Sequence, residues 1–402
     1  MSSACADPRH GYAQLLRRPR YPGFVLTVSL SRTCSTMFNT AGVLLVLART
    51  GSAALAGATA AAAVLPGAVS GPFLGAWLDV ARRRRILIVF DQLLSAAALV
   101  AIVALAGHAP AWTLLAVAFM YSVTRPLSMG SFFSALAEIA GPELLDRASS
   151  VEATSINLSF VVGPALAGAL AGTAGPATAV ETQAAVTLIV ALLVAINPAF
   201  EARPPERARS ASQAIRIGLR SLTGDPVLRA TGGAATLAAF GWGLMTVAFP
   251  LYAARLLHAG AHAGGYLWAA MALGSTLGTF LLAGRPSLRR IGLSYGVLGL
   301  SALLWPLAQT LALGILLIGV TGFLEGPAYS GTIALRQRRA PAAVRAQVMT
   351  TLTSVALVAS AAGAATSGAI DRPVPAIVAF TVINGLAAFT ALRGRMVSHG
   401  SD

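Results

Sequence analysis

Twelve long apolar runs constrain this 402-residue chain more than any other feature of its sequence. Each run is long enough to cross a hydrocarbon core of about 30 Å as an α-helix. The runs are continuously apolar rather than alternating, which favours helices over the strands of a membrane barrel. They lie near residues 21–47, 53–78, 86–107, 111–135, 150–172, 177–198, 227–256, 262–283, 291–309, 311–334, 346–369 and 373–392. The sequence therefore predicts an all-α membrane protein of about twelve transmembrane helices.

Charged residues are too few to cover the surface of a water-soluble protein of this length. They make up 11% of the sequence, whereas soluble domains carry about 25%. The net charge of +15 would suit a nucleic-acid-binding protein, but the basic residues lie in clusters between the apolar runs. There they act as topology signals. We therefore expect a lipid bilayer around the chain and no nucleic acid as a partner.

All 29 basic residues are arginine, and their distribution predicts the orientation of the chain. If the helices alternate in direction from a cytoplasmic N-terminus, 24 arginines fall on the cytoplasmic side and three on the other. Basic loops are enriched on the cytoplasmic side of membrane proteins. The split predicts a multi-pass protein of the inner (cytoplasmic) membrane with both termini in the cytoplasm.

The two halves of the chain repeat each other. Seven residues of segment 135–165 recur 199 positions later, and five residues of segment 57–74 recur 207 positions later. Two parallel repeats of six helices are the plan of one class of transporters. We expect an N-terminal six-helix bundle over 1–198, a basic cytoplasmic linker over 199–225 and a C-terminal six-helix bundle over 226–402. The linker contains either a short helix on the membrane surface or only a flexible connection.

A segment rich in arginine joins the second and third runs. It reads Gly75-Ala-Trp-Leu-Asp79-Val-Ala-Arg82-Arg83-Arg84-Arg85. It resembles the signature G-x-x-x-D-R-x-G-R-R of the major facilitator superfamily, from which it departs at Val80 and Arg82. In that family the segment latches the two halves together on the cytoplasmic side. The resemblance therefore implies a cytoplasmic gate that contains Gly75, Asp79, Arg82, Arg83 and the following Asp91, while the arginines also anchor the topology.

The fifth run contains a second motif built from small residues and a proline. It reads Ser159-Phe-Val-Val-Gly163-Pro164-Ala-Leu-Ala-Gly168. It resembles the G-x-x-x-G-P-x-x-G-G signature of exporting branches of the same superfamily. Pro164 can bend the helix, and Gly163 and Gly168 let another helix approach closely. Gly-Pro kinks are also common in membrane helices of other kinds.

Other segments resemble the macrolide-efflux and enterobactin-exporter-like branch of the superfamily. They are Thr50-Gly51-Ser52-Ala53, Leu65-Pro66, Asp91, Arg125-Pro126 and Pro142-Glu143-Leu144. The resemblance implies the major facilitator fold, with two pseudo-symmetric six-helix bundles. It also implies proton-driven export of amphiphilic drugs or natural products. In the family, the first, fourth, seventh and tenth spans line a central cavity.

Three charged residues lie well inside the runs, where a charge is costly and indicates a function. Arg32 lies in the first run, Arg125 in the fourth and Glu325 in the tenth. Either Glu325 takes up a proton and pairs with Arg125 or Arg32 when ionised, or these charges form a fixed structural ion pair. We expect Asp91 and Glu152 to lie near the cytoplasmic ends of their helices, where water satisfies them.

Five aromatic residues inside the runs have two possible environments. They are Tyr121, Trp242, Phe249, Trp268 and Tyr329. They either line the cavity or face the lipid and the membrane interface, where aromatic residues are common.

We expect a monomeric secondary active exporter that works by alternating access and that binds a small-molecule substrate and protons. An importer of the same fold stays open. So does a transporter of anions or siderophores, because two arginines in the cavity favour an anion. A polytopic membrane enzyme is the alternative from another class, but it needs a cluster of catalytic groups at one membrane face, and the sequence shows none. We expect no cofactor and no metal site.

Overall fold

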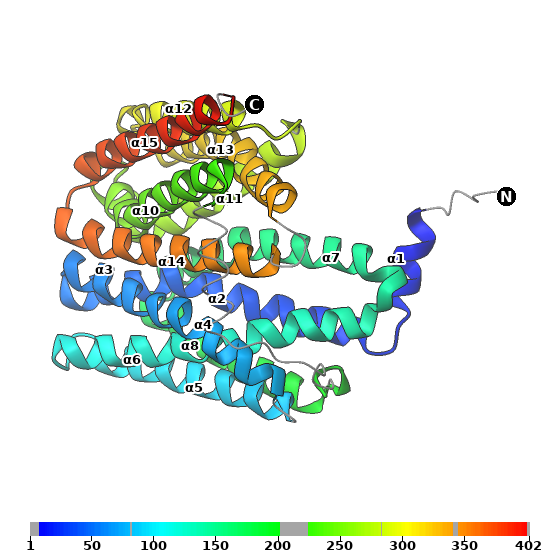
Figure 1. Ribbon diagram of the computed structural model, residues 1–402. Helices are drawn as coiled ribbons and strands as arrows, with labels where there is room; N and C mark the ends of the chain where they lie inside the picture. Colours follow the sequence, from blue (N-terminus) through cyan, green and yellow to red (C-terminus); the bar gives the residue numbers. More distant parts are fainter. Residues whose placement is uncertain (1–7, 81–82, 202–223, 283, 341–344, 400–402) are drawn as a thin grey trace.

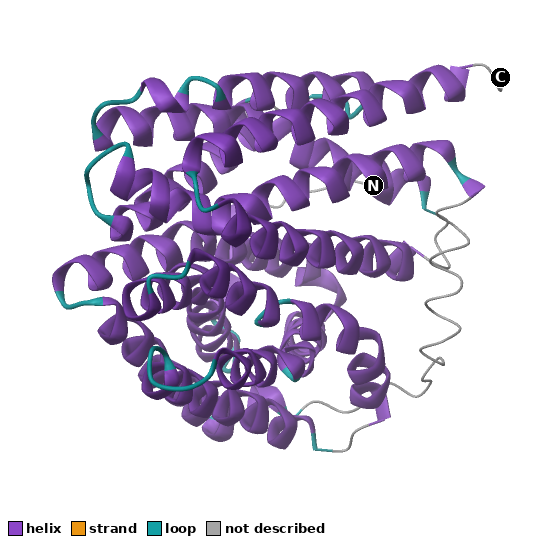
Figure 2. Cartoon of the chain, turned by 90° about the vertical axis from the view of Figure 1, so that its left-hand side faces the viewer, coloured by secondary structure: helices purple, strands orange, loops and turns teal. Residues whose placement is uncertain are grey.

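The computed structural model describes residues 8–80, 83–201, 224–282, 284–340 and 345–399, which form helices joined mostly by short turns (Figure 2). The first half contains α1 (Pro8–Leu16), α2 (Tyr21–Thr50), α3 (Ala53–Ala62), α4 (Leu65–Val80), α5 (Arg84–Leu105), α6 (Ala111–Val123), α7 (Arg125–Thr173) and α8 (Pro176–Ile196). The second half contains α10 (Pro226–Arg255), α11 (Gly264–Leu281), α12 (Leu288–Ala302), α13 (Leu311–Arg339), α14 (Arg345–Ile370) and α15 (Pro373–His399). Short 3₁₀ turns are η1 (Pro198–Phe200), η2 (Ala261–Ala263) and η3 (Trp305–Leu307). The prediction of an all-α protein is confirmed, while most of the predicted linker lies outside the described residues.

Within this described part, nine helical segments are long and apolar enough to cross a membrane. They correspond to nine of the twelve predicted spans. The other three predicted spans also fall on helices, namely α2, α6 with the start of α7, and α11. Arg32 and several Ser and Thr residues lower the hydropathy of α2, and glycines lower that of α11. The 13 residues of α6 are too few to cross a membrane without the start of α7.

Prolines mark the positions where two of the predicted spans are divided, and a glycine marks a kink between two others. The second span is split between α3 and α4, just before Pro66, and the fourth is split between α6 and α7, just before Pro126. Proline lacks the backbone donor that would continue the ladder of hydrogen bonds. Residues 136–149 lie between the fourth and fifth predicted spans. In the structure α7 continues through these residues and kinks at Gly141, whose φ is 67°. Glycine adopts such a positive φ without the steric strain of a side chain.

The helices form two groups. Helices α10 to α13 and α15 lie together in the upper part of Figure 1, and α3 to α6 and α8 lie together in the lower part. Helices α2 and α7 belong to the lower group, which we call the N-terminal group, and α14 belongs to the upper, C-terminal group. Within the groups, α2 packs on α7 and α8, and α10 packs on α14 and α15. Between the groups, α3 contacts α14, and α7 contacts α11.

The two groups approach most closely at one end of the bundle, which we call the tight end. It contains the turns near residues 51, 107, 174, 260 and 371. There a Cβ added to Gly57 of α3 would lie 3.2 Å from the Cα of Gly368 of α14. A Cβ added to Gly168 of α7 would lie 3.3 Å from the Cα of Gly265 of α11. Small residues let membrane helices pack backbone to backbone, so glycine sets the distance between the groups here.

Candidate functional site

Glu325 lies in α13 and is held by neutral donors from two neighbouring helices. The indole Nε1 of Trp242, on α10, donates a hydrogen bond of 2.9 Å to its Oε1. Ser275, on α11, lies close enough to interact with its side chain. Among the residues that the structure describes, no arginine or histidine lies within ion-pair distance of this carboxylate. The structure therefore does not bring Glu325 together with Arg125 or Arg32.

The orientation of α13 turns Glu325 toward the interior of the bundle. Leu316 and Val320 are 60% and 46% exposed and form an outer face of the helix. With 3.6 residues per turn, Glu325 and Tyr329 fall on the opposite face. Tyr329 is nevertheless 53% exposed. Its ring therefore points into the interior of the bundle, one turn from the carboxylate.

Aromatic side chains pack beside this carboxylate. The ring centroid of Trp242 lies 5.9 Å from that of Trp268 and 4.7 Å from that of Phe380. Phe249 packs edge-on against Trp268, with centroids 5.1 Å apart. Trp242 and Trp268 are half-buried and Phe249 is buried, so none of the three is a lipid-facing side chain. Of the two environments considered for these residues, the structure favours the interior one.

Arg32 of α2 forms a buried ion pair with Glu152 of α7. Its NH2 contacts Oε1 of Glu152, and its NH1 donates a hydrogen bond of 3.4 Å to the backbone carbonyl of the same residue. The guanidinium also lies over the ring of Phe133, 5.5 Å from its centroid. Glu152 is only 6% exposed. The expectation that water satisfies Glu152 is therefore wrong, because an arginine from the first span neutralises it instead.

Asp91 of α5 is the centre of a second buried cluster. Its carboxylate accepts hydrogen bonds from Thr124 (2.6 Å), from Gln92 (3.1 Å) and from the hydroxyl of Ser128. Asp91 is 1% exposed. The expectation that it meets water at a helix end is therefore wrong. Thr124 and Ser128 flank the break between α6 and α7, so the carboxylate holds this break in place.

Arg125 begins α7 and lies beside the Asp91 cluster. Its NH1 donates a hydrogen bond of 2.9 Å to the hydroxyl of Tyr121, and its guanidinium lies 5.2 Å from the centroid of that ring. The same hydroxyl accepts a hydrogen bond of 3.1 Å from Gln183 of α8. Asp91 is close enough to act electrostatically on Arg125 without forming an ion pair. The hydrogen-bond partner of Arg125 and the nearby acid Asp91 thus both belong to its own half.

The predicted cytoplasmic gate is only partly described. Gly75 and Asp79 lie in the last part of α4, and Arg83 is exposed immediately before α5. Arg82 lies outside the described residues, and so do the surroundings of the Asp79 side chain. Asp91 belongs to the buried cluster and not to the surface of this segment. The gate therefore stays a prediction.

The segment with Gly163, Pro164 and Gly168 lies in α7 and contacts helices of both groups. A Cβ added to Gly163 would lie 2.9 Å from the backbone N of Met37 in α2. A Cβ added to Gly168 would lie 2.6 Å from the backbone carbonyl oxygen of His262, next to α11. Both glycines therefore permit contacts that any larger residue would block.

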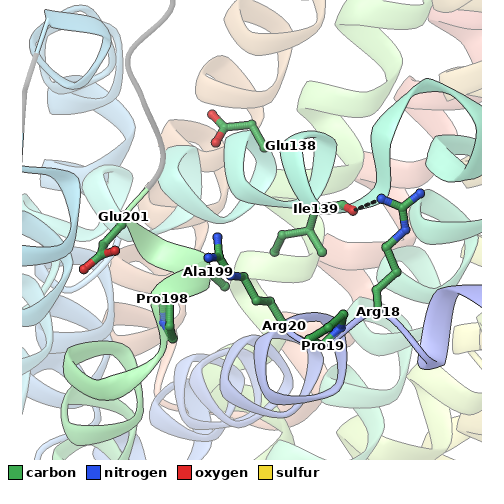
Figure 3. Close-up of a pocket in the computed structure, with 8 residues that line it drawn as sticks. All are labelled: Arg18, Pro19, Arg20, Glu138, Ile139, Pro198, Ala199 and Glu201. Atoms are coloured by element: carbon green, nitrogen blue, oxygen red, sulfur yellow. Dashed lines mark hydrogen bonds between the residues drawn. The ribbon is translucent and has the colours of Figure 1, made fainter.

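A separate cavity of about 590 Å³ opens at the other end of the N-terminal group. It is lined by Arg18, Pro19, Arg20, Glu138, Ile139, Pro198, Ala199 and Glu201 (Figure 3). Arg18 donates a hydrogen bond of 3.3 Å to the carbonyl of Ile139, and Glu201 forms an ion pair of 2.7 Å with Arg85. The lining of this cavity carries charges of both signs, and the cavity is separate from Glu325.

No group of three or more His, Cys, Asp and Glu that could hold a metal ion occurs in the described ranges.

The chemistry open to the charged residues inside the bundle is to bind and release a proton or an ion. Arg32 and Glu152 form a neutral pair, and Asp91 is held by three donors. Glu325 is different, because no arginine of the described residues acts on it electrostatically, whereas Arg32 acts on Glu152 and Arg125 on Asp91. The Arg32–Glu152 pair and the Asp91 cluster are the two features that sequence reasoning missed. The rule that intramembrane charges pair with one another was the available signal for the first.

A family model described as Major Facilitator Superfamily matches residues 24–398 of the chain. An uncharacterised MFS-type transporter of Sinorhizobium fredii is 30% identical over 370 residues, which cover 89% of this chain and 90% of that relative. The multidrug efflux pump Tap of Mycobacterium tuberculosis is 30% identical over 344 residues, which cover 81% and 80%.

Solved structures share the fold. A bacterial homolog of the human lysosomal transporter Spinster, in an inward-facing and unoccupied conformation, has a TM-score of 0.74 at 15% identity, over 97% of this chain and 98% of that one. The POT family transporter PepTSo has a TM-score of 0.73 at 14% identity, over 96% and 100%. At these identities the likeness shows the architecture of two six-helix bundles and does not extend to the substrate.

Proposed function

We propose that this chain, which belongs to the major facilitator superfamily, is a proton-coupled exporter of amphiphilic drugs or natural products. It is a multi-pass membrane transporter, and export, coupling and substrate class are the parts that we propose. The observation that carries the proposal is the position of Glu325, an interior acid that only neutral donors hold.

The proposal that transport runs outward, as export, rests on similarity to known relatives. Tap, which is named a multidrug efflux pump, is similar over most of both chains. The Gly163–Gly168 segment, which resembles the signature of exporting branches, lies at the contact between α7 and α11. A contact between the two groups must open and close during alternating access. Close packing of glycines makes such a contact tight without a bulky side chain that would block closure.

Proton coupling rests on the surroundings of Glu325. An ionised carboxylate inside a membrane protein is costly unless something compensates its charge. Protonation removes that charge, so the two protonation states favour different surroundings. A proton can therefore shift the equilibrium between two conformations, provided that its affinity differs between them. Trp242 and Ser275 come from α10 and α11, and the same two helices contact the N-terminal group. Movement between the groups therefore has a direct route to the carboxylate.

The orientation that we propose follows from the arginines. With both termini in the cytoplasm, the tight end, where the two groups pack backbone to backbone, faces the periplasm. The protein would lie in the inner membrane as a monomer, with bundles over 1–198 and 226–402 joined by a cytoplasmic linker. A reporter fused at residue 210 should then read cytoplasmic, and one fused at residue 260 periplasmic.

Transport into inside-out membrane vesicles tests the proposal. Vesicles that contain the protein and are energised to an acidic interior should accumulate neutral fluorescent amphiphiles from a panel, and an uncoupler should abolish the accumulation. Glu325→Gln should abolish it, whereas Glu181→Gln should not, because Glu181 is an exposed acid of α8. Loss of the amphiphile from preloaded vesicles, driven by the same gradient, would instead identify an importer.

A further inference from the structure

The cavity of about 590 Å³ in the N-terminal group lies where membrane-crossing segments end. Of its lining residues, Arg18 and Arg20 shortly precede α2, and Pro198 and Ala199 follow α8. Figure 1 shows α1, which ends just before Arg18, running across the direction of the long helices, at the end of the bundle opposite the tight end. When helices cross a bilayer, their ends lie at the level of the lipid headgroups. The cavity therefore lies between the hydrocarbon and the water.

The two acidic side chains of the lining are already paired with arginines of α5. Oε1 of Glu201 lies 2.7 Å from NH2 of Arg85, and Oε1 of Glu138 lies 3.7 Å from NH1 of Arg84. Arg84 is 3% exposed, and none of its guanidinium nitrogens has a hydrogen-bond partner among the described residues. The buried charge of Arg84 therefore offsets that of Glu138. The acids of the lining are thus compensated without using the arginines of the lining.

Arg18 and Arg20 are the surplus positive charges of the cavity. Arg18 donates a hydrogen bond of 3.3 Å to the backbone carbonyl of Ile139, whereas a guanidinium has five N–H donors. No ion pair is found for Arg18 or Arg20 among the described residues. Both side chains are exposed, and Figure 3 shows Arg18 reaching toward Ile139 of α7 and Arg20 reaching toward Ala199 of η1. Donors of both arginines therefore remain available to an anion in the cavity.

An exposed apolar stripe on α8 ends at the level of the cavity. Ile189, Leu192 and Ile196 are 50%, 60% and 65% exposed. Their spacing of three and four residues puts them on one face of the helix, which suits contact with lipid. Ile196 is two residues before Pro198 of the cavity lining. An acyl chain along this stripe therefore carries its headgroup to the height of the cavity.

We propose that the cavity binds the phosphate group of an anionic phospholipid, such as phosphatidylglycerol, through Arg18 and Arg20. Guanidinium groups match phosphate because two parallel N–H groups donate to two of its oxygens. Basic pockets between membrane helices on the cytoplasmic side bind anionic headgroups, and the orientation proposed above places the cavity on that side. A phosphate bound there joins the start of α2 to α7, close to its kink at Gly141. The inference goes beyond the proposed function, since neither export nor proton coupling at Glu325 depends on it.

Binding of soluble short-chain lipids to the purified full-length protein in a mild detergent tests the proposal. The probes are dihexanoyl phosphatidylglycerol and dihexanoyl phosphatidylcholine, which has the same chains and no net charge. Inorganic phosphate is the probe without chains. Native mass spectrometry counts the bound molecules at each concentration. The wild-type protein should bind phosphatidylglycerol more tightly than phosphatidylcholine, and inorganic phosphate should not displace it. Displacement at equal concentration would assign the cavity to a soluble phosphate and overturn the lipid.

Two double variants assign the lipid to the cavity. Arg18→Gln with Arg20→Gln should weaken binding of phosphatidylglycerol by about tenfold or more and leave phosphatidylcholine unchanged. Arg285→Gln with Arg289→Gln is the matched control, because both arginines are exposed and lie between α11 and α12, at the same end of the other half. The control should bind phosphatidylglycerol as the wild-type protein does. An equal loss in both double variants, or no loss in the first, would overturn the site.

Substitution of an acid of the lining should act in the opposite direction. Glu138→Gln removes a negative charge beside the bound phosphate and should tighten binding of phosphatidylglycerol. A purely structural role of the two arginines predicts no such gain. This single variant keeps Arg18 and Arg20, so it tests the site even if their double variant fails to fold. Weaker or unchanged binding of phosphatidylglycerol by Glu138→Gln would contradict a phosphate in the cavity.

Discussion

Removing one partner of the Arg32–Glu152 pair should destabilise the protein far more than removing both. Both side chains are less than a tenth exposed, so the charge that remains is buried without its partner. Breaking a buried pair in this way costs about 3–5 kcal/mol, whereas replacing both ions by neutral groups is often nearly neutral. We expect costs in that range for Arg32→Gln and for Glu152→Gln, and a cost below about 2 kcal/mol for the double variant.

The two single variants should also respond differently to pH. In Glu152→Gln, Arg32 keeps its hydrogen bond of 3.4 Å to the backbone carbonyl and its contact with Phe133, and it stays charged at every accessible pH. In Arg32→Gln, the Glu152 carboxylate loses its ion pair with Arg32, and uptake of a proton neutralises the carboxylate. As the pH falls, Arg32→Gln should therefore gain stability relative to Glu152→Gln, which has no carboxyl group at this position to titrate.

Unfolding in mixed micelles of a mild detergent and dodecyl sulfate, at neutral and at acidic pH, measures these free energies. The matched control is the exposed pair of Arg255 and Asp371, whose side chains are 48% and 59% exposed and 3.2 Å apart. Breaking that pair should cost less than about 1 kcal/mol. The reasoning would be refuted if the cost of the double variant equalled the sum of the two single costs. It would also be refuted if breaking the buried pair cost no more than breaking the exposed pair.

Three further substitutions test other parts of the structure. Asp91→Ala should cost about 1–3 kcal/mol in the same unfolding assay, because it leaves hydroxyl and amide donors buried without an acceptor. A cost no larger than that of Asp371→Ala would contradict a stabilising role of the buried hydrogen bonds to Asp91. The Gly168→Leu variant should insert into the membrane normally but lose transport, since even a Cβ would lie 2.6 Å from the carbonyl oxygen of His262. Full transport by this variant would show that the two halves do not need to close at the contact between α7 and α11. Asp79→Asn should leave insertion intact and slow transport, because only a charge near a helix end is lost, and a normal rate would reduce Asp79 to a surface charge.

The helices could be predicted from sequence because lipid leaves the backbone few choices. Every peptide group in the hydrocarbon must find a partner within its own segment, so a continuous apolar run is a helix. Pro66 and Pro126 mark helix breaks in the same local way. The long α7 shows the limit, since its helix continues beyond the apolar run, through polar residues up to and past Gly141.

The site could be predicted only in part, because apolar patterns do not show which helix faces which. Arg32, Arg125 and Glu325 stand out as charges in apolar runs. Their partners depend on packing between segments far apart in the chain, and Glu152 lies 120 residues from Arg32. Position along a helix likewise suggested that Asp91 meets water, whereas the contact of α5 with the break between α6 and α7 encloses it. Tertiary packing decided both outcomes.

The central claim, that Glu325 couples protons to export, is tested most directly by comparing exchange with accumulation. Proteoliposomes that contain the wild-type protein or Glu325→Gln are loaded with a neutral amphiphilic substrate, and uptake of labelled substrate is followed with and without a proton gradient. Exchange needs binding and alternating access but no net proton movement. We predict that Glu325→Gln exchanges substrate at a rate near that of the wild-type protein and accumulates none when the gradient is applied. Gradient-driven accumulation by Glu325→Gln that matches the wild-type protein across a pH series would contradict the claim.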